Sequence, residues 1–170
     1  MSSLIQQALQ QQKPFPSIEG EVFVALQLAA NRALDPWARF LRQQERLTPN
    51  QYNVLRILRG AHPAGLTCGQ IADRMITRDP DVTRLTDRLV RDGLAHRARN
   101  AADRRVVEVS IAPEGLATLD RLEAPSRAMA VALLGSIGSD RLVALRDLLG
   151  TLVAEIGTFA PRHETVNHTI

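Results

Sequence analysis

Three signals for the start of a helix follow one another closely between Thr48 and Pro80. Thr48 and Thr67 are each followed three residues later by a Gln. This is the pattern of a capping box, in which hydroxyl and amide bind backbone groups that a helix start leaves unpaired. The third signal is Asp79-Pro80, with Asp79 as the cap and Pro80 at the first helical position. The sequence therefore predicts three consecutive helices, which begin near residues 49, 68 and 80, the second of them short and ending near Met75.

A hairpin is expected after the third helix. That helix ends at Gly93, a residue that favours the left-handed conformation of a helix stop. The apolar residues then change from a period of about 3.6 to a period of 2. Residues 94–99 and 106–111 are accordingly predicted to be strands, joined by a polar tip at 100–105. Three helices followed by such a hairpin have the order of a winged helix-turn-helix.

The segment before this block is predicted to be a helix with an interruption. Residues 17–46 carry apolar residues at three- and four-residue steps, as on one face of a helix. Asp35-Pro36 inside the segment predicts a kink or a restart, with Asp35 as the cap. Residues 1–16 are Gln-rich and are expected to form a mobile arm.

The segment after the block is also predicted to be helical. One helix is expected to open at Pro113, to kink at Pro125 and to break at residues 135–138. The last helix begins at Ser139, and its apolar residues lie close to a heptad seam, which fits either a partner helix or burial within the chain. The seam consists of Leu142, Leu145, Leu149, Leu152, Ile156 and Phe159.

Basic charge is concentrated in the predicted winged block. The chain has a formal net charge of +3, and of its 21 basic residues only Lys13 is a lysine. Residues 67–107 alone carry nine arginines and six aspartates, so the rest of the chain is neutral in sum. Such an island is expected at a polyanion site, because neutralising phosphates releases counterions. It also fits a solvated surface rich in ion pairs.

The third helix of the block is amphipathic in a way that suits duplex DNA. If Val82, Leu85 and Leu89 are buried, the arginines of this helix project outward. An exposed helix of this kind fits the major groove, where recognition helices read bases with their N-terminal residues. We therefore assign base edges or nearby sugars to Pro80, Asp81, Thr83 and Arg84, and phosphate to Arg88.

Charged residues at the ends of this surface have further interpretations. Asp81 can accept a hydrogen bond from a cytosine amino group, or it can cap the helix and interact with its dipole. Arg104 and Arg105, at the hairpin tip, are expected to reach the adjacent minor groove or the DNA backbone. Asp103 is expected to fold the tip by pairing with one of these two arginines.

Four stretches of the chain, in this order and spacing, resemble the MarR family of bacterial regulators. They are LTPNQYNVLRIL, LTCGQIADRM, PDVTRLTDRLVRDGL and NAADRRVVEVSIAPEG, within residues 47–115. The resemblance implies a triangular homodimer joined by its terminal helices, with one recognition helix per subunit in successive major grooves of a pseudo-palindrome. It places in the DNA-reading helix Thr77, Arg78, Pro80, Asp81, Thr83, Arg84 and Arg88, and it matches Asp103 and Arg105 to the family's D-x-R wing motif.

The resemblance also implies an effector site and a division of the chain. Family members often respond to small, frequently phenolic ligands in a crevice between the dimer helices and the DNA-binding lobe. Here that crevice would involve Trp37, Phe40, Tyr52 and Arg56, although core packing also explains the aromatic residues. We thus expect a mainly α protein in five parts: a mobile arm (1–16), an N-terminal dimerisation helix region (17–46), a winged DNA-binding lobe (47–112), C-terminal dimerisation helices (113–160) and a flexible tail (161–170).

The function expected is that of a sequence-specific, double-stranded DNA-binding transcriptional regulator, a repressor released by an effector. The alternative is a winged module that binds another protein and no DNA, since six aspartates lie among the arginines. Neither a glycine-rich phosphate loop nor a Ser-His-Asp or Cys-His set indicates an enzyme. The scattered histidines indicate no metal site, and we expect no cofactor.

Two further expectations concern Cys68 and localisation. Cys68 is the single cysteine and lies in the first turn of the predicted second helix. It is either a small buried residue or a thiol whose pKa the helix dipole lowers. The sequence shows neither a secretory signal nor a run of about 18 apolar residues, which favours a cytoplasmic protein.

Overall fold

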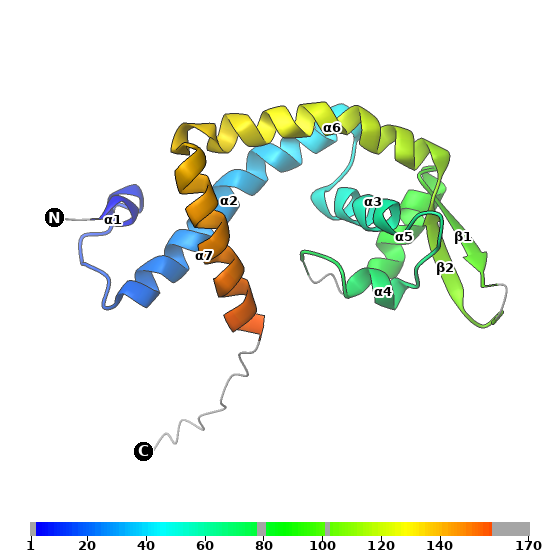
Figure 1. Cartoon of the computed structure of the whole chain (residues 1–170), viewed down its shortest axis with the longest axis horizontal. Helices are drawn as coiled ribbons and strands as arrows, with labels where there is room; N and C mark the ends of the chain where they lie inside the picture. The colour runs from blue at the N-terminus through cyan, green and yellow to red at the C-terminus, as the bar shows by residue number, and fades with distance from the viewer. Residues whose placement is uncertain (1–2, 78–80, 101–102, 158–170) are drawn as a thin grey trace, which may run out of the picture. The chain divides into compact units, whose positions relative to one another are not determined.

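The computed structural model describes residues 3–77, 81–100 and 103–157, which form seven α-helices, one short 3-10 helix and a two-stranded hairpin (Figure 1). The chain divides into two compact units, Met1–Arg127 and Ala128–Ile170, and the boundary falls inside helix α6. The mainly α fold with a hairpin agrees with the prediction from sequence. In chain order the elements are α1 (Leu4–Ala8), α2 (Ile18–Glu45), α3 (Pro49–Ala61), α4 (Cys68–Ala72), α5 (Val82–Arg91), β1 (Ala95–Arg99), β2 (Val107–Ile111), α6 (Pro113–Leu134), η1 (Gly135–Ile137) and α7 (Ser139–Gly157).

Both predicted capping boxes are present. Thr48 Oγ1 accepts a hydrogen bond from the backbone N–H of Gln51 at 3.2 Å, and Gln51 Oε1 accepts one from the N–H of Thr48 at 2.9 Å. Thr67 and Gln70 make the same two hydrogen bonds at the start of α4. These caps fix the starts of α3 and α4 where the sequence predicts them, although α4 ends at Ala72 and not near Met75.

Helix α5 begins later than the sequence predicts. Its N-cap is Asp81, whose carboxylate accepts a hydrogen bond from the N–H of Arg84 at 3.1 Å. The expected cap Asp79 and the expected first helical residue Pro80 lie outside the described residues. The predicted start is wrong because a second aspartate, two positions later, supplies the same capping carboxylate. The predicted end is confirmed, since Gly93 has a φ of +74° directly after the helix.

Helix α2 continues through Pro36 without a restart, so Asp35 is not a cap. Pro36 has no N–H to donate to the carbonyl of Arg32. Arg32 is exposed, and its carbonyl can therefore bind water. Beyond the proline, Leu41 is fully buried, which anchors the end of the helix to the core. The predicted restart is wrong, because the helix accommodates the one backbone hydrogen bond that the proline cannot make. Helix α6 likewise contains Pro125 without a break.

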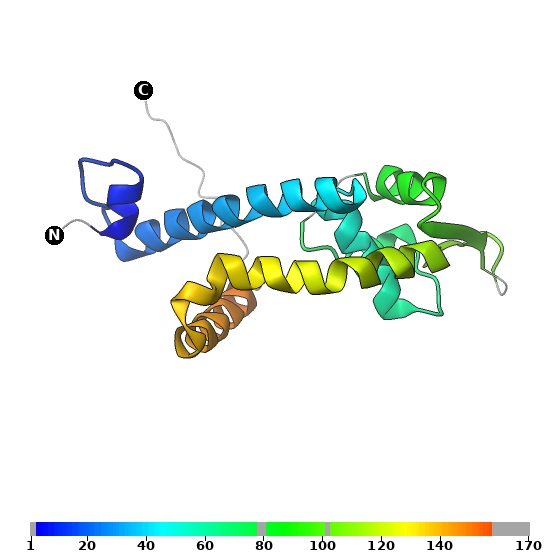
Figure 2. The ribbon, with the colours of Figure 1, turned by 90° about the horizontal axis from the view of Figure 1, so that it is seen from above.

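The hydrophobic core lies in the first unit, where α3, α4, α5 and the hairpin pack against the end of α2 and the first turns of α6. The predicted inward face of α5 is confirmed, because Val82, Leu85 and Leu89 are all buried. β1 pairs with β2 in antiparallel register, and an isolated bridge between Leu66 and Val109 adds a second, shorter pairing to β2. The hairpin projects from the helical cluster in both views (Figures 1 and 2).

The second unit contains the end of α6, η1 and α7. No residue of α7 is buried, and the helix exposes much of the predicted seam; Phe159 lies outside the described residues. Among the described residues, no single helix has the length and apolar composition of a membrane span, and only the bent pair Pro113–Ile137 and Ser139–Gly157 meets that test jointly. The exposed apolar residues of α7 are Val143, Leu145, Leu148, Leu149, Val153 and Ile156.

Candidate DNA-binding surface

The exposed side of α5 carries the residues that the sequence assigned to DNA. Thr83, Arg84 and Arg88 are all exposed, and the side chain of Arg84 is 70% exposed. Because the helix period fixes the outer face once the inner face is packed, the three buried apolar residues determine where these side chains project. The structure thus brings Thr83, Arg84 and Arg88 together on the solvent side of one short helix.

Asp81 acts on both the helix and its first arginine. One carboxylate oxygen accepts the capping hydrogen bond, and the other lies 3.3 Å from Nε of Arg84. The capping interpretation of Asp81 therefore describes its contacts in this structure. The ion pair also limits the directions in which Arg84 can point. Thr77, which the resemblance places in the DNA-reading helix, precedes α5, and Arg78 and Pro80 lie outside the described residues.

The arginines of the basic island differ in their partners. Arg91 pairs with Asp92 at 3.2 Å, and Arg97 pairs with Asp87 at 2.6 Å. Part of the island is therefore neutralised by its own aspartates, as the ion-pair interpretation predicts. Within the described part of the chain, five arginines of the island form no ion pair: Arg74, Arg88, Arg99, Arg104 and Arg105.

The wing tip is folded by Asp103, but not through an arginine side chain. The Asp103 carboxylate accepts a hydrogen bond from the backbone N–H of Arg105 at 2.9 Å. The N–H of Asp103 donates to the side-chain oxygen of Asn100 at 3.1 Å. The predicted ion pair is wrong because a backbone donor two residues away is nearer than either flexible guanidinium. Arg104 and Arg105 consequently remain exposed at the tip.

A cavity of about 280 Å³ lies between α2, α3 and the segment after α4. Trp37, Tyr52 and Arg56 line it, as the resemblance implies. The ring of Tyr52 meets Trp37 edge to face, with centroids 5.3 Å apart, and lies under the guanidinium of Arg56 at 6.0 Å. Phe40 is not part of the lining; it stacks on Trp37 with its centroid 5.3 Å away.

Two residues that sequence reasoning missed connect this cavity to the segment before α5. Asn53 lines the cavity, and its Oδ1 accepts a hydrogen bond from the backbone N–H of Ile76 at 2.9 Å. Ile76 also lines the cavity, yet it is 88% exposed. The sequence could have indicated Asn53, because it is a polar residue next to Tyr52. No sequence pattern indicates its long-range partner.

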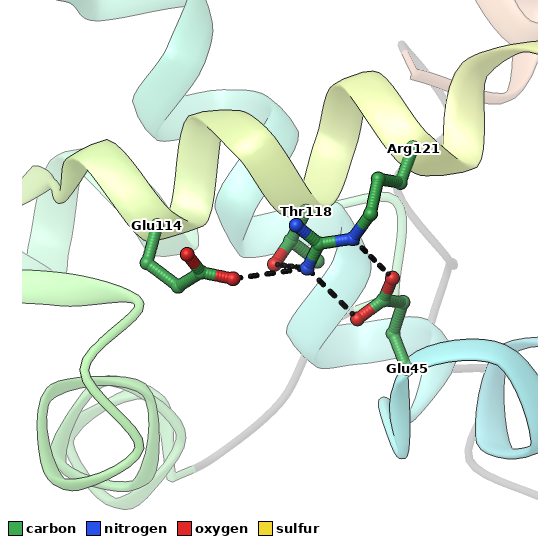
Figure 3. A network of polar contacts seen from close by, with 4 residues as sticks. All are labelled: Glu45, Glu114, Thr118 and Arg121. Atoms are coloured by element: carbon green, nitrogen blue, oxygen red, sulfur yellow. Dashed lines mark hydrogen bonds and ion pairs between the residues drawn. The ribbon is translucent and has the colours of Figure 1, made fainter.

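A polar network joins the end of α2 to α6 (Figure 3). Arg121 donates to both carboxylate oxygens of Glu45, at 2.8 and 3.1 Å. It also donates to Glu114 Oε1 at 2.9 Å and to Thr118 Oγ1 at 3.0 Å. These hydrogen bonds lower the pKa of Glu45 and raise that of Arg121. The network fixes the last turn of α2 to the first half of α6.

Three short helices and a basic hairpin, with the third helix exposing arginines, define a winged helix-turn-helix DNA-binding protein. The sequence pattern of the MarR family matches residues 47–107. A crystal structure of a MarR transcription factor from Planctomyces limnophilus is 39% identical, with a TM-score of 0.61, and the match covers 81% of this chain and 98% of that one. This chain belongs to the MarR family and is a DNA-binding transcriptional regulator, not an enzyme.

Two other relatives extend the comparison. The HTH-type transcriptional repressor MdtR of Bacillus subtilis (strain 168) is 36% identical over 73 residues, which are 43% of this chain and 46% of MdtR. The match thus spans less than half the length of that relative. The organohalide-sensing transcriptional regulator RdhR, in its 2,4-dichlorophenol-bound form, is 18% identical with a TM-score of 0.74, covering 91% of this chain and 89% of that one. This last likeness shows the shared fold.

Proposed function

We propose that this regulator is a repressor that binds a pseudo-palindromic operator as a homodimer and is released by a small aromatic effector. The observation that carries the proposal is the amphipathic α5, whose buried face directs Arg84 and Arg88 outward. Family membership and the likeness to the repressor MdtR support the same function.

Each DNA-facing residue has a proposed role. Thr83 and Arg84 read base edges or nearby sugars from the start of α5, and Arg88 binds phosphate farther along the helix. Arg104 and Arg105 reach the adjacent minor groove or the backbone from the wing tip. We assign the same DNA-reading role to Thr77, Arg78, Pro80 and Asp81, because the resemblance places them in the DNA-reading helix and they stand in the chain directly before α5.

The proposed homodimer is supported by exposed apolar surface on both terminal regions. Ile18 and Phe23 of α2 are each 66% exposed. Helix α7 buries none of its apolar residues within the chain. Contiguous exposed apolar residues on a helix typically mark a surface that binds a partner. We assign them to a second copy of the chain, with α2, α6 and α7 as the dimerisation helices.

The DNA part of the proposal is tested on an operator obtained by in vitro selection of bound duplexes. The double variant Arg84→Ala/Arg88→Ala should lose specific binding and keep its thermal unfolding midpoint, because both side chains are exposed. Arg59→Ala is the matched control, since Arg59 lies on α3, outside the proposed DNA surface and the proposed dimerisation helices, and pairs with Asp120 at 3.7 Å. Unchanged operator affinity in the double variant would contradict the assignment. A chain without any affinity for duplex DNA at low salt would favour the protein-interaction alternative.

The effector part of the proposal depends on the cavity and its link to α5. Because Asn53 both lines the cavity and holds the N–H of Ile76, a ligand that binds the Asn53 amide competes with the segment leading to α5. We use 2,4-dichlorophenol as the probe, the compound bound in the RdhR structure. It should bind the protein and weaken operator binding, and Trp37→Leu should reduce both effects. If the probe binds nowhere near Trp37, the effector site is wrong and the DNA proposal stands.

A further inference from the structure

Arg97 belongs to the basic island by sequence, but its guanidinium contacts the protein. It lies on β1, opposite Val109 of β2. Its Nη2 donates to Thr86 Oγ1 at 3.0 Å, and its Nη1 lies 2.6 Å from Asp87 Oδ1. The Arg97 side chain is 32% exposed, less than half the value for Arg84. The two ends of one guanidinium thus hold two consecutive residues of the recognition helix.

The hydroxyl of Thr86 explains why this contact is directional. Thr86 is fully buried, and its single hydroxyl proton is donated to the carbonyl of Thr83 at 2.9 Å. The oxygen can then only accept, which suits the Arg97 donor. The thiol of Cys68, whose Sγ lies 3.8 Å from the same oxygen, must likewise be the donor. The Oγ1 atom of Thr86 in α5 therefore contacts both the start of α4, through Cys68, and strand β1, through Arg97.

We propose that Arg97 is a positioning residue for DNA recognition and does not itself neutralise a phosphate. Asp87 already balances its charge, and the planar guanidinium matches the two acceptors on α5. Holding β1 against α5 fixes the separation between the wing tip and the exposed arginines of the helix. If the wing and α5 are already held in this arrangement in the free protein, no free energy is spent on ordering them when DNA binds. The inference rests on the proposed operator binding.

The salt dependence of operator binding distinguishes positioning from phosphate contact. Each neutralised phosphate adds about 0.9 to the slope of log affinity against log salt concentration. Arg97→Met should weaken operator binding on the order of tenfold, the effect of one hydrogen bond to a charged group, with the slope unchanged. Arg88→Met should reduce the slope by about one. Arg97→Lys should behave like Arg97→Met, because an ammonium does not engage both acceptors, although it would serve as a phosphate contact.

Substitutions at Thr86 test the same contact from the other side. Thr86→Val removes the hydroxyl and should weaken operator binding without changing the slope. Thr86→Ser keeps the hydroxyl and should retain the wild-type affinity. Arg97→Met and Thr86→Val should be non-additive when combined, since both remove the hydrogen bond between Arg97 and Thr86. All variants are compared well below their measured unfolding midpoints, so that loss of the folded lobe does not enter the affinities.

The outcomes separate this inference from the function on which it rests. If Arg97→Met lowers the slope by about one and Arg97→Lys restores affinity, Arg97 contacts phosphate and the inference is overturned. Additive effects of the two substitutions would overturn it as well. A wild-type chain that binds no duplex would remove the proposed function and the inference with it, a result visible before any variant is made.

Discussion

The winged lobe, residues 47–112, and helix α7 are both rich in apolar residues, but only the lobe buries them. Leu55, Leu58 and Leu89 are fully buried in the lobe. In α7, Leu148 and Val153 are 70% and 72% exposed. The periodicity of apolar residues therefore predicts that a helix has an apolar face. It does not predict whether that face packs against the same chain or against another molecule.

The contrast has a thermodynamic consequence. Apolar surface removed from water within one chain stabilises the fold at any protein concentration. Surface that a second copy covers stabilises the fold only when that copy is bound, so its contribution follows mass action. The lobe and α7 should thus respond differently to dilution, and the following substitutions test that difference, from the largest expected effect to the smallest.

The largest effect is expected in the core of the lobe. Leu89→Ala leaves a cavity beside residues that cannot fully close around it and should lower the free energy of unfolding by about 2–5 kcal/mol. Urea unfolding followed by circular dichroism gives this value. Ile76→Ala is the matched control, because Ile76 is almost fully exposed and should change stability by no more than about 0.5 kcal/mol. A cost for Leu89→Ala as small as that of the control would contradict the described core.

The next effect concerns α7 and should depend on concentration. Leu149→Glu/Ile156→Glu places charges two turns apart on the exposed apolar seam and should convert a dimer into monomers in sedimentation velocity. The unfolding midpoint of the wild type should rise with protein concentration, and that of the variant should not. Thr151→Glu, on another side of the same helix, should remain dimeric. A wild-type protein that is monomeric at every concentration would refute the proposal that a second copy of the chain packs on the apolar seam of α7.

A smaller effect is expected at the first capping box. Thr48→Ala removes the acceptor of the Gln51 N–H and should cost about 1 kcal/mol of unfolding free energy. Thr48→Ser retains the hydroxyl and should cost less. Chemical denaturation resolves the two variants. Because the cap lies within the lobe, the cost should be the same at low and high protein concentration, unlike that of the α7 variant.

The smallest effect is expected at the network that joins α2 to α6. Hydrogen bonds from Arg121 hold the pKa of Glu45 below its usual value. A carboxylate with a lowered pKa in the folded state stabilises the fold at neutral pH, and this contribution is lost as the pH falls through the folded-state pKa. The unfolding midpoint of the wild type should therefore exceed that of Glu45→Gln slightly at pH 7 and equal it in acid, once the pH lies below the folded-state pKa of Glu45. A difference that persists in acid would exclude the ionic interaction as its cause.

The sequence predicted most of the lobe because its signals are local. A capping box, a glycine stop and a change of period each involve residues close in the chain, and the caps at Thr48 and Thr67 are confirmed. The start of α5 was wrong because two aspartates compete for one capping role. The restart at Pro36 was wrong because a proline removes one backbone hydrogen bond and does not by itself end a helix.

The candidate site was predictable in part for the same reason. The outward direction of Arg84 and Arg88 follows from helix period alone. The inward contacts of Arg97 do not, because they depend on the pairing of a strand with a helix that precedes it in the chain. The same holds for Asn53 and Ile76, which lie 23 positions apart. The five-residue helix α1 lies in the segment 1–16, for which we predicted a mobile arm.

Under the proposed function, Asn53 would couple effector binding to operator recognition, because it lines the cavity and holds the backbone N–H of Ile76. A lineage that adapts the cavity to a new compound by changing position 53 also changes the support of Ile76 in the same step. If the proposed effector site is correct, such a change would alter operator recognition together with ligand preference. Divergence in ligand preference with an unchanged operator is therefore expected to proceed through other wall positions, such as Leu34, whose side chain has no part in that hydrogen bond.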